Sequence, residues 1–316
     1  MRVSVIICSI GRPGILDDTV QSLLHQTYPI DEILIGTPST ENVLPSSLEH
    51  PVVRLLLTKT GLTVQRNACL SSVKASSDLV VFVDDDMEFA PSYMAAMVEL
   101  FEATPDLIVS SGNLLFDGGV GKSIGREEAR RLCAGKQAES SIRTSPRRSS
   151  AYGCNMAYRA SMIRDKSFDE RLPLYGWLED TDFSHSCTRG GRPPLDNLNA
   201  YAVHLGWRGG RISGRRLGFS QVVNPFYLWK KSRVCSLPHL VIHYWVRCIV
   251  GNILGLVWGE PIEDRPGRLF GNLLGFRHLL SGQLDPQHAA KITVPISSPA
   301  NVTPIRGEPQ RVPVPE

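Results

Sequence analysis

Apolar and polar positions along the first 116 residues follow a pattern that predicts a layered α/β fold. Short apolar runs rich in β-branched residues predict strands over 3–9, 32–36, 52–58, 79–83 and 107–112. Between these runs, apolar residues recur at helical spacing and predict helices over 13–25, 62–75 and 91–103. Strands that alternate with helices indicate a Rossmann-like, mixed, mostly parallel sheet flanked by helices. No GxGxxG follows the first strand, so the dinucleotide fingerprint is absent.

The pattern changes twice before residue 218. Residues 117–150 are rich in Gly, Ser and basic side chains and predict a basic flexible loop, with a short helix over 127–134. This loop is either a solvated insertion or a grip for an anionic ligand. From residue 151 the alternation resumes, with strands over 152–158 and 200–205 and a helix over 178–189. Residues 1–218 are therefore expected to form one domain, with halves 1–116 and 151–218.

Residues 219–284 are expected to form a helical C-terminal extension, with helices over 219–233 and 269–280. The stretch 237–258 is strongly apolar but contains His239, His243 and Arg247, which makes it marginal as a membrane span. Two alternatives remain for it: a surface helix in contact with a membrane, or a helix buried against a neighbour. Residues 285–316 are rich in Pro and polar side chains and predict a disordered tail.

Composition excludes some functional classes. The 316 residues carry a net charge of +3, which is too small to indicate a nucleic-acid partner. Seven scattered cysteines without a CxxC pair favour a reducing compartment, hence the cytoplasm, over a disulfide framework or a zinc ribbon. The apolar run at the N-terminus is too short for a signal peptide and is expected to be the first strand.

The most informative polar motif is Asp84-Asp85-Asp86, directly after the predicted strand 79–83. Three adjacent carboxylates repel one another, and burying them is costly unless a cation compensates. A divalent cation with a phosphate on its far side is the usual compensation, and ligands of open α/β sheets bind at the carboxyl ends of strands. The motif therefore predicts a metal–phosphate site. The alternative is a solvated loop with acidic helix caps.

Three further groups are candidates for the same site. Glu179-Asp180 with Asp182 opens a helix and offers a general base, although acids in a first helical turn also act as caps. His204 ends a strand and is either structural, a third metal ligand or a phosphate contact. Arg208 and Arg211 lie in a Gly-rich stretch that suits a diphosphate, unless they simply form a basic surface.

The chain resembles family 2 glycosyltransferases of the GT-A fold over about residues 3–231. The resemblance rests on an ordered set of motifs: VIICSIGRP (5–13), SLLHQTYP (22–29), EILI (32–35), QRNA (65–68), the triple Asp, GCNMAYR (153–159) and EDTD (179–182). It implies inverting transfer of a sugar from a nucleotide-diphosphate donor, with Mn²⁺ or Mg²⁺ as cofactor. Residues 1–116 would be the nucleotide-binding half and 151–218 the acceptor half. Polysaccharide or glycolipid synthesis would be the setting, with a glycan or lipid-linked acceptor.

The resemblance also implies roles for individual residues. Asp180 matches the general base, and Asp84 and Asp86 match the metal-binding pair, which His204 would complete. The positions expected to contact the nucleotide are Ser9, Arg12, Thr37, Arg66, Asp84 and Asp85. Those expected near the donor sugar and acceptor are Gly153, Cys154, Asn155, Trp177 and Glu179. The family's base-reading acid after the second strand is replaced here by Gly36-Thr37-Pro38, which leaves the nucleotide base open.

Two other functions remain as alternatives. A nucleotidyltransferase shares the sheet and the acidic metal site but releases pyrophosphate from a nucleoside triphosphate. A non-enzymatic protein could instead use the basic segments to bind acidic lipid or nucleic acid. The glycosyltransferase hypothesis predicts a cytoplasmic enzyme, free or peripheral on the inner membrane face.

Overall fold

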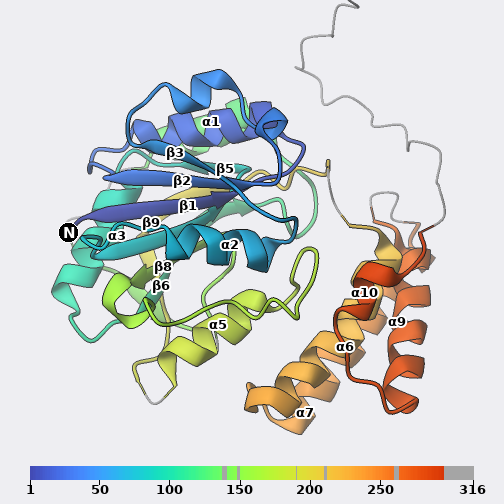
Figure 1. Cartoon of the computed structure of the whole chain (residues 1–316). Helices are drawn as coiled ribbons and strands as arrows, with labels where there is room; N and C mark the ends of the chain where they lie inside the picture. The colour runs from blue at the N-terminus through green and yellow to red at the C-terminus, as the bar shows by residue number, and fades with distance from the viewer. Residues whose placement is uncertain (137–140, 148–149, 190, 210–211, 260–262, 295–316) are drawn as a thin grey trace, which may run out of the picture.

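A computed structural model describes residues 1–136, 141–147, 150–189, 191–209, 212–259 and 263–294. A nine-stranded sheet in the order β3-β2-β1-β4-β8-β6-β9-β5, with β7 beside β9, carries helices on both faces (Figure 1). The strands are β1 (Val3–Cys8), β2 (Glu32–Thr37), β3 (Val53–Leu57), β4 (Leu79–Asp84), β5 (Met87–Phe89), β6 (Val109–Asp117), β7 (Thr144–Pro146), β8 (Asn155–Arg159) and β9 (Leu195–His204). The helices of this part are α1 (Pro13–Leu24), α2 (Leu62–Ser71), α3 (Tyr93–Ala103), α4 (Arg126–Ala134) and α5 (Glu179–Thr188).

Strand direction explains where a site can form. Strands β3, β2, β1, β4, β6 and β9 all run the same way, while β8, β5 and β7 run against them. The carboxyl ends of six strands therefore meet at one edge, where ligands of such sheets bind. This arrangement confirms the predicted mixed, mostly parallel sheet with flanking helices, the GT-A fold.

Alternation along the strands divides the core into two layers. Val3, Val5 and Ile7 of β1 face helices α1 and α3, and Ile6 between them faces the layer that includes α2 and α5. Buried residues that alternate between the two faces of one strand, with helices on both sides, are what a covered parallel sheet requires. The predicted helices and strands of residues 1–116 are thus present, and short β5 is an addition that the sequence pattern did not indicate.

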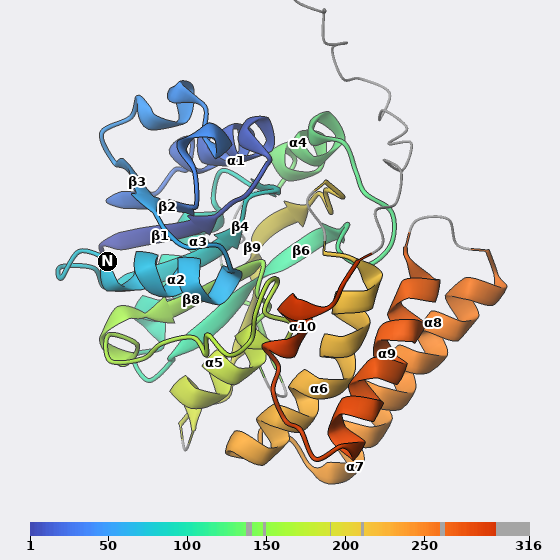
Figure 2. The same ribbon diagram turned by 45° about the vertical axis from the view of Figure 1, so that its right-hand side comes forward.

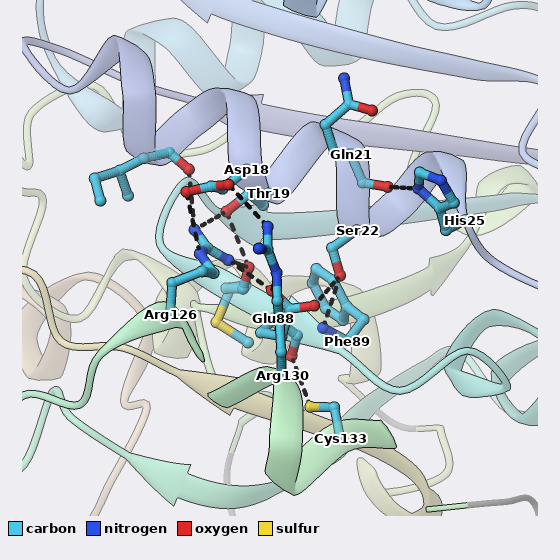
Figure 3. A network of polar contacts seen from close by, with 12 residues as sticks. Asp18, Thr19, Gln21, Ser22, His25, Glu88, Phe89, Arg126, Arg130 and Cys133 are labelled. Atoms are coloured by element: carbon cyan, nitrogen blue, oxygen red, sulfur yellow. Dashed lines mark hydrogen bonds and ion pairs between the residues drawn. The ribbon is translucent and has the colours of Figure 1, made fainter. Parts of the chain in front are cut away.

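The short helix predicted within the basic segment is present as α4. Helix α4 docks onto α1 and β5, and the Arg126 side chain is only 10% exposed. Its guanidinium donates to the carboxylate of Glu88 at 3.1 Å and to the hydroxyl of Thr19 at 3.0 Å, while Arg130 pairs with Asp18 at 2.9 Å (Figure 3). These cations therefore hold the segment on the sheet, because buried Glu88 and partly exposed Asp18 compensate their charge.

The C-terminal extension is a helical unit beside the sheet domain (Figure 2). It contains α6 (Gly214–Ser232), α7 (Leu237–His239), which continues through a π-helical stretch (Leu240–Val246) into α8 (Arg247–Val257), then α9 (Arg265–Leu280) and α10 (His288–Lys291). The predicted disorder from residue 285 is wrong for 285–294, because Ala289 and Ile292 are buried against Phe219 and Val223 of α6. Residues 295–316 lie outside the described part of the chain.

Helices α6 and α9 approach closely because glycines line their interface. A Cβ at Gly218 would overlap the carbonyl oxygen of Arg268, and a Cβ at Gly271 would overlap that of Arg215. Gly275 repeats the contact one turn later, against Val222. Close backbone approach of this kind maximises van der Waals contact between two helices.

We predict that Gly271→Ala destabilises the fold by about 1–3 kcal/mol, because the added methyl group overpacks the α6–α9 interface. The measurement is the free energy of unfolding in urea. Gly251→Ala on α8 is the matched control, since nothing lies within 4 Å of a Cβ there. The control should leave stability unchanged or raise it by about 0.5–1 kcal/mol. Equal stability of both variants would contradict the proposed glycine contact.

Candidate active site

The three aspartates after β4 have different surroundings. Asp85 is fully buried, where the Ser9 hydroxyl donates to its carboxylate and Arg12 forms an ion pair with it at 2.8 Å. Burial raises the pKa of Asp85 to about 7, against the opposing charge of Arg12. Asp85 therefore ties the end of β1 to the turn after β4. Ser9 and Arg12, both predicted to contact the nucleotide, are brought to this edge, Arg12 with its side chain 23% exposed.

Asp84, Asp86 and His204 form the cluster that the sequence analysis predicted as a metal site. One ligand atom of each lies within 4.8 Å of the others. The Asp86 carboxylate accepts from the Trp207 N–H at 2.6 Å and lies 3.3 Å from His204 Nε2. Burial opposes ionisation of Asp86, but His204 and Trp207 outweigh it and lower its pKa to about 2. Two carboxylates and an imidazole are a donor set for a divalent cation.

Asp117, at the end of β6, is a residue that the sequence analysis missed. Its carboxylate accepts from Nδ1 of His204 at 2.8 Å and from the Tyr152 hydroxyl at 2.9 Å. Burial alone would favour neutral His204, but Asp117 and Asp86 raise the pKa of His204 to about 10. The space between the Asp117 and Asp86 carboxylates, where the His204 ring lies, thus stabilises a positively charged group. With Nδ1 held by Asp117, Nε2 is the nitrogen that faces Asp86, an orientation typical of metal-ligating histidines.

Arg66 on α2 connects this cluster to the second acidic group. Its guanidinium is 2% exposed, donates to Glu179 and to the Gly153 carbonyl (2.8 Å), and lies 3.5 Å from Asp84. Gly153 donates its N–H to Asp180 at 3.0 Å, and the neighbouring Cys154 carbonyl accepts from the Asp84 N–H at 3.1 Å. The two acidic groups, 95 positions apart in the chain, therefore share one site.

Glu179 and Asp180 differ in access. Glu179 is 5% exposed and paired with Arg66, and burial raises its pKa to about 8 although Arg66 opposes that shift. Asp180 is half-buried; one carboxylate oxygen accepts from Gly153 and the other from the Thr181 N–H at 2.7 Å. Asp182 lies on another side and pairs with Lys231 of α6 at 2.7 Å. Of the three acids, Asp180 is the oriented and accessible carboxylate.

Several predicted contact residues lie beneath the site. Asn155 is fully buried and accepts from Gly112 and the Tyr93 hydroxyl, and the Cys154 side chain is 4% exposed in the core. The Thr37 hydroxyl is also buried, at 2.9 Å from the amide of Asn42 that donates to it. The side chains of these three predicted residues therefore face the core. Asn42, which the sequence analysis missed, links Thr37 to the Gly11 N–H (2.8 Å).

Trp177 lies in a loop with unusual backbone geometry just before α5. Leu174, Gly176 and Leu178 have φ of 62°, 64° and 73°, a region that non-glycine residues rarely adopt. Two contacts hold the loop: Leu174 accepts from the Leu62 N–H at 2.9 Å, and the Trp177 carbonyl accepts from Asn224 of α6 at 2.9 Å. Strained backbone of this kind is concentrated at functional sites. The loop places Trp177 next to Glu179 and Asp180.

Arg208, one of the two basic residues predicted to contact a diphosphate, has partners within the protein. Arg208 donates to the Gly121 carbonyl and pairs with Glu263 at 3.5 Å, so it joins the loop after β6 to the start of α9. Arg211 lies outside the described residues. The network of Figure 3 supports the acidic turn instead: the Thr19 hydroxyl, held by Arg126, lies 2.6 Å from the Asp85 carbonyl oxygen.

Comparisons with known proteins find similar sequences among glycosyltransferases. Over 125 residues the chain is 26% identical to the glucosyl-dolichyl phosphate glucuronosyltransferase of Haloferax volcanii, covering 37% of this chain and 39% of that protein. Over 119 residues it is 29% identical to the uncharacterized glycosyltransferase YwdF of Bacillus subtilis, covering 36% and 43%. The chain thus spans less than half of these curated relatives' lengths.

A solved structure shows the same fold. The mannosyltransferase PcManGT of Pyrobaculum calidifontis, in complex with GDP-Man and Mn²⁺, superposes with a TM-score of 0.51 at 15% identity, over 87% of each chain. The family model described as glycosyl transferase family 2 matches residues 4–166, which is more than half of the sequence and includes the triple Asp. The chain therefore belongs to glycosyl transferase family 2.

Proposed function

We propose that this protein is a glycosyltransferase that moves a sugar from a nucleotide-diphosphate donor to an acceptor hydroxyl with inversion. The observation that carries the proposal is the joining of two acidic groups at the carboxyl edge of the sheet by Arg66 and residues 153–154. Direct displacement needs a base on the acceptor side and a stabilised leaving group on the other. Asp180 supplies the first, and the cluster of Asp84, Asp86 and His204 supplies the second.

The donor set fits a divalent cation. Asp84, Asp86 and His204 would hold it, and when bound it would neutralise charge on the leaving diphosphate. A nitrogen ligand favours Mn²⁺ over Mg²⁺, which prefers oxygen and water. Arg12 at the same edge and Arg208 beyond β9 would add cationic character around the phosphates. Ser9 and Asn42 would shape the nucleotide pocket from the loops after β1 and β2.

Asp180 is the residue that we assign as general base. Its two carboxylate oxygens are held by separate backbone N–H groups, so the side chain is oriented before the acceptor arrives. Glu179 is withdrawn into the ion pair with Arg66 and would orient the acceptor loop through Trp177. The acceptor is a glycan or a lipid-linked glycan, in polysaccharide or glycolipid synthesis. The enzyme would act in the cytoplasm, with peripheral membrane contact through 237–258.

The proposal is tested by incubating the protein with a panel of sugar nucleotides, an acceptor mixture and Mn²⁺ or Mg²⁺. The expected product is a nucleoside diphosphate whose release needs both metal and acceptor. Pyrophosphate from nucleoside triphosphates would indicate a nucleotidyltransferase instead. Strongly salt-dependent binding of lipid or nucleic acid, without any turnover, would indicate the non-enzymatic alternative.

Two substitutions separate donor binding from turnover. Asp86→Ala removes one metal-binding carboxylate, so the thermal stabilisation by nucleotide diphosphate plus Mn²⁺ should be lost. Asp180→Asn should keep that stabilisation but lower turnover by about 10²- to 10⁴-fold, because the acceptor's proton has no base to accept it. Full transfer activity in Asp180→Asn would show that the base assignment is wrong.

Asp117 is expected to position His204 for the cation. Asp117→Ala should weaken Mn²⁺ binding by about 10- to 100-fold in calorimetric titration, because the imidazole loses the partner of Nδ1. Asp117→Asn, whose amide oxygen still accepts from Nδ1, should weaken it less. Asp106→Asn is the control, since this exposed acid pairs with Arg192 away from the site. Unchanged Mn²⁺ affinity in Asp117→Ala would remove Asp117 from the metal site.

A further inference from the structure

The helical unit of α6, the 237–257 helix and α9 buries polar side chains and exposes apolar ones. Asn252 of α8, Gln221 of α6 and Asn272 of α9 are 1%, 8% and 4% exposed. The amide of Asn252 donates to Gln221 at 3.1 Å and to Asn272 at 3.0 Å, and Arg265 donates to Asn252 at 3.1 Å. Asn and Gln side chains are seldom buried in the interior of water-soluble proteins. In this unit they occur beside glycine contacts, and polar side chains that hydrogen-bond between closely packed helices are typical of helix packing in lipid.

The outer surface of this unit carries an apolar stripe along the 237–257 helix and further exposed apolar side chains on α9. Ile242, Val246, Val250, Ile253 and Val257 recur every three or four residues along the 237–257 helix, and each is at least 44% exposed. Phe270 and Leu273 of α9 are exposed at 45% and 65%. The 237–257 helix is 21 residues long, which with its apolar composition is enough to cross a membrane, and little of it is buried inside the protein. A patch on two packed helices is too large to be a scatter of surface residues.

The charge and the aromatic residues around the stripe identify its partner. Residues 219–284 contain seven Lys or Arg and three Asp or Glu, so this segment is cationic although the remaining chain is nearly neutral. Arg247 and Arg277 are exposed beside the stripe, and Trp258 at its end is 77% exposed. Cationic side chains at the edge of an apolar helix face, with a terminal Trp, fit the interface of an anionic lipid bilayer.

The attachment of α6 decides how the unit meets lipid. Lys231 pairs with Asp169 at 2.8 Å and with Asp182 at 2.7 Å, and the Tyr227 hydroxyl donates to Asp169 at 2.7 Å. These contacts keep α6 on the sheet domain, while α8 lies on the outer side of the unit (Figure 2). One face of the unit is therefore committed to the domain, and the opposite face alone is open to lipid.

We propose that the α8–α9 face lies in the interfacial layer of a bilayer that contains anionic lipid, parallel to its plane. This lipid contact follows from the helices alone. Only its consequence for the acceptor, given next, rests on the proposed function. Tyr244 of the apolar helix packs edge-on against Trp177, with ring centroids 6.1 Å apart, and Trp177 directly precedes Leu178 and the acids. The bilayer surface would thus adjoin the acceptor side of the site, which suits a lipid-linked acceptor.

The test is vesicle flotation of the full chain with phosphatidylcholine vesicles, with and without phosphatidylglycerol. The wild type should float with the anionic vesicles. Val250→Glu/Ile253→Glu should lower the bound fraction about tenfold or more, because charge in the stripe opposes insertion. Leu132→Glu/Met162→Glu is the matched control, since these apolar residues are similarly exposed, at 40% and 41%, but lie outside the unit. The control should float like the wild type.

Two further measurements make each outcome decisive. Thermal unfolding, and stabilisation by nucleotide diphosphate with Mn²⁺, should be the same in Val250→Glu/Ile253→Glu as in the wild type, so a loss of flotation is separated from a failure of the donor site. Alkaline carbonate should release the bound protein, and retention would overturn the in-plane placement. Absence of flotation would overturn the bilayer as the partner of this face. A lipid-free dimer that Val250→Glu/Ile253→Glu dissociates would identify a second copy of the chain as the partner instead.

Discussion

The site depends on one buried cation. Gathering several carboxylates at a sheet edge is unfavourable, because each must leave water near charges of the same sign. Arg66 lies among them, within reach of Asp84, Glu179 and the Gly153 carbonyl. Its Cζ atom lies 5.8 Å from the ring centroid of Phe82 and 5.5 Å from that of Phe168. A planar guanidinium can meet several acceptors and aromatic faces at once, which an ammonium group does not do. The two acidic groups can therefore approach each other without a bound ligand.

The same balance of charge gives each carboxylate its task. Asp85 and Glu179 are buried with arginine partners and have raised pKa values, of about 7 and about 8, because burial outweighs the attraction of those partners. Asp86, with the His204 ring beside it, has its pKa lowered to about 2. Asp180 is the acid that backbone N–H groups orient toward the open side. In each pair of neighbouring acids, Asp85-Asp86 and Glu179-Asp180, the first pairs with an arginine and stabilises the sheet edge. Under the proposed function the second is available to a ligand.

Local patterns predicted the sheet well and the supporting residues poorly. The strand ending in Asp84-Asp85-Asp86 and the helix opening at Glu179 are visible in the sequence, because a buried strand and a capped helix leave period and charge signals. Asp117 and Asn42 are single polar residues whose partners lie 87 and 31 positions away, and no spacing rule connects them. Thr37 and Asn155 match family positions but turn into the core, since side-chain direction depends on register that motifs do not specify.

The C-terminal helices show how composition alone is ambiguous. His239, His243 and Arg247 make 237–258 marginal as a membrane span, and its composition fits a surface helix at a membrane and a buried helix equally well. In the structure the polar and apolar residues of this helix lie on different faces. Asn252 and Gly255 are buried inside the unit, whereas the stripe from Ile242 to Val257 is exposed. Helix α6 then joins this unit to the site through Asn224, which holds the Trp177 carbonyl, and Lys231, which holds Asp182. Because the same helix contacts the loop of Trp177 and packs against the unit with the apolar face, the orientation of that face would, under the proposed function, also set the direction from which an acceptor reaches Asp180.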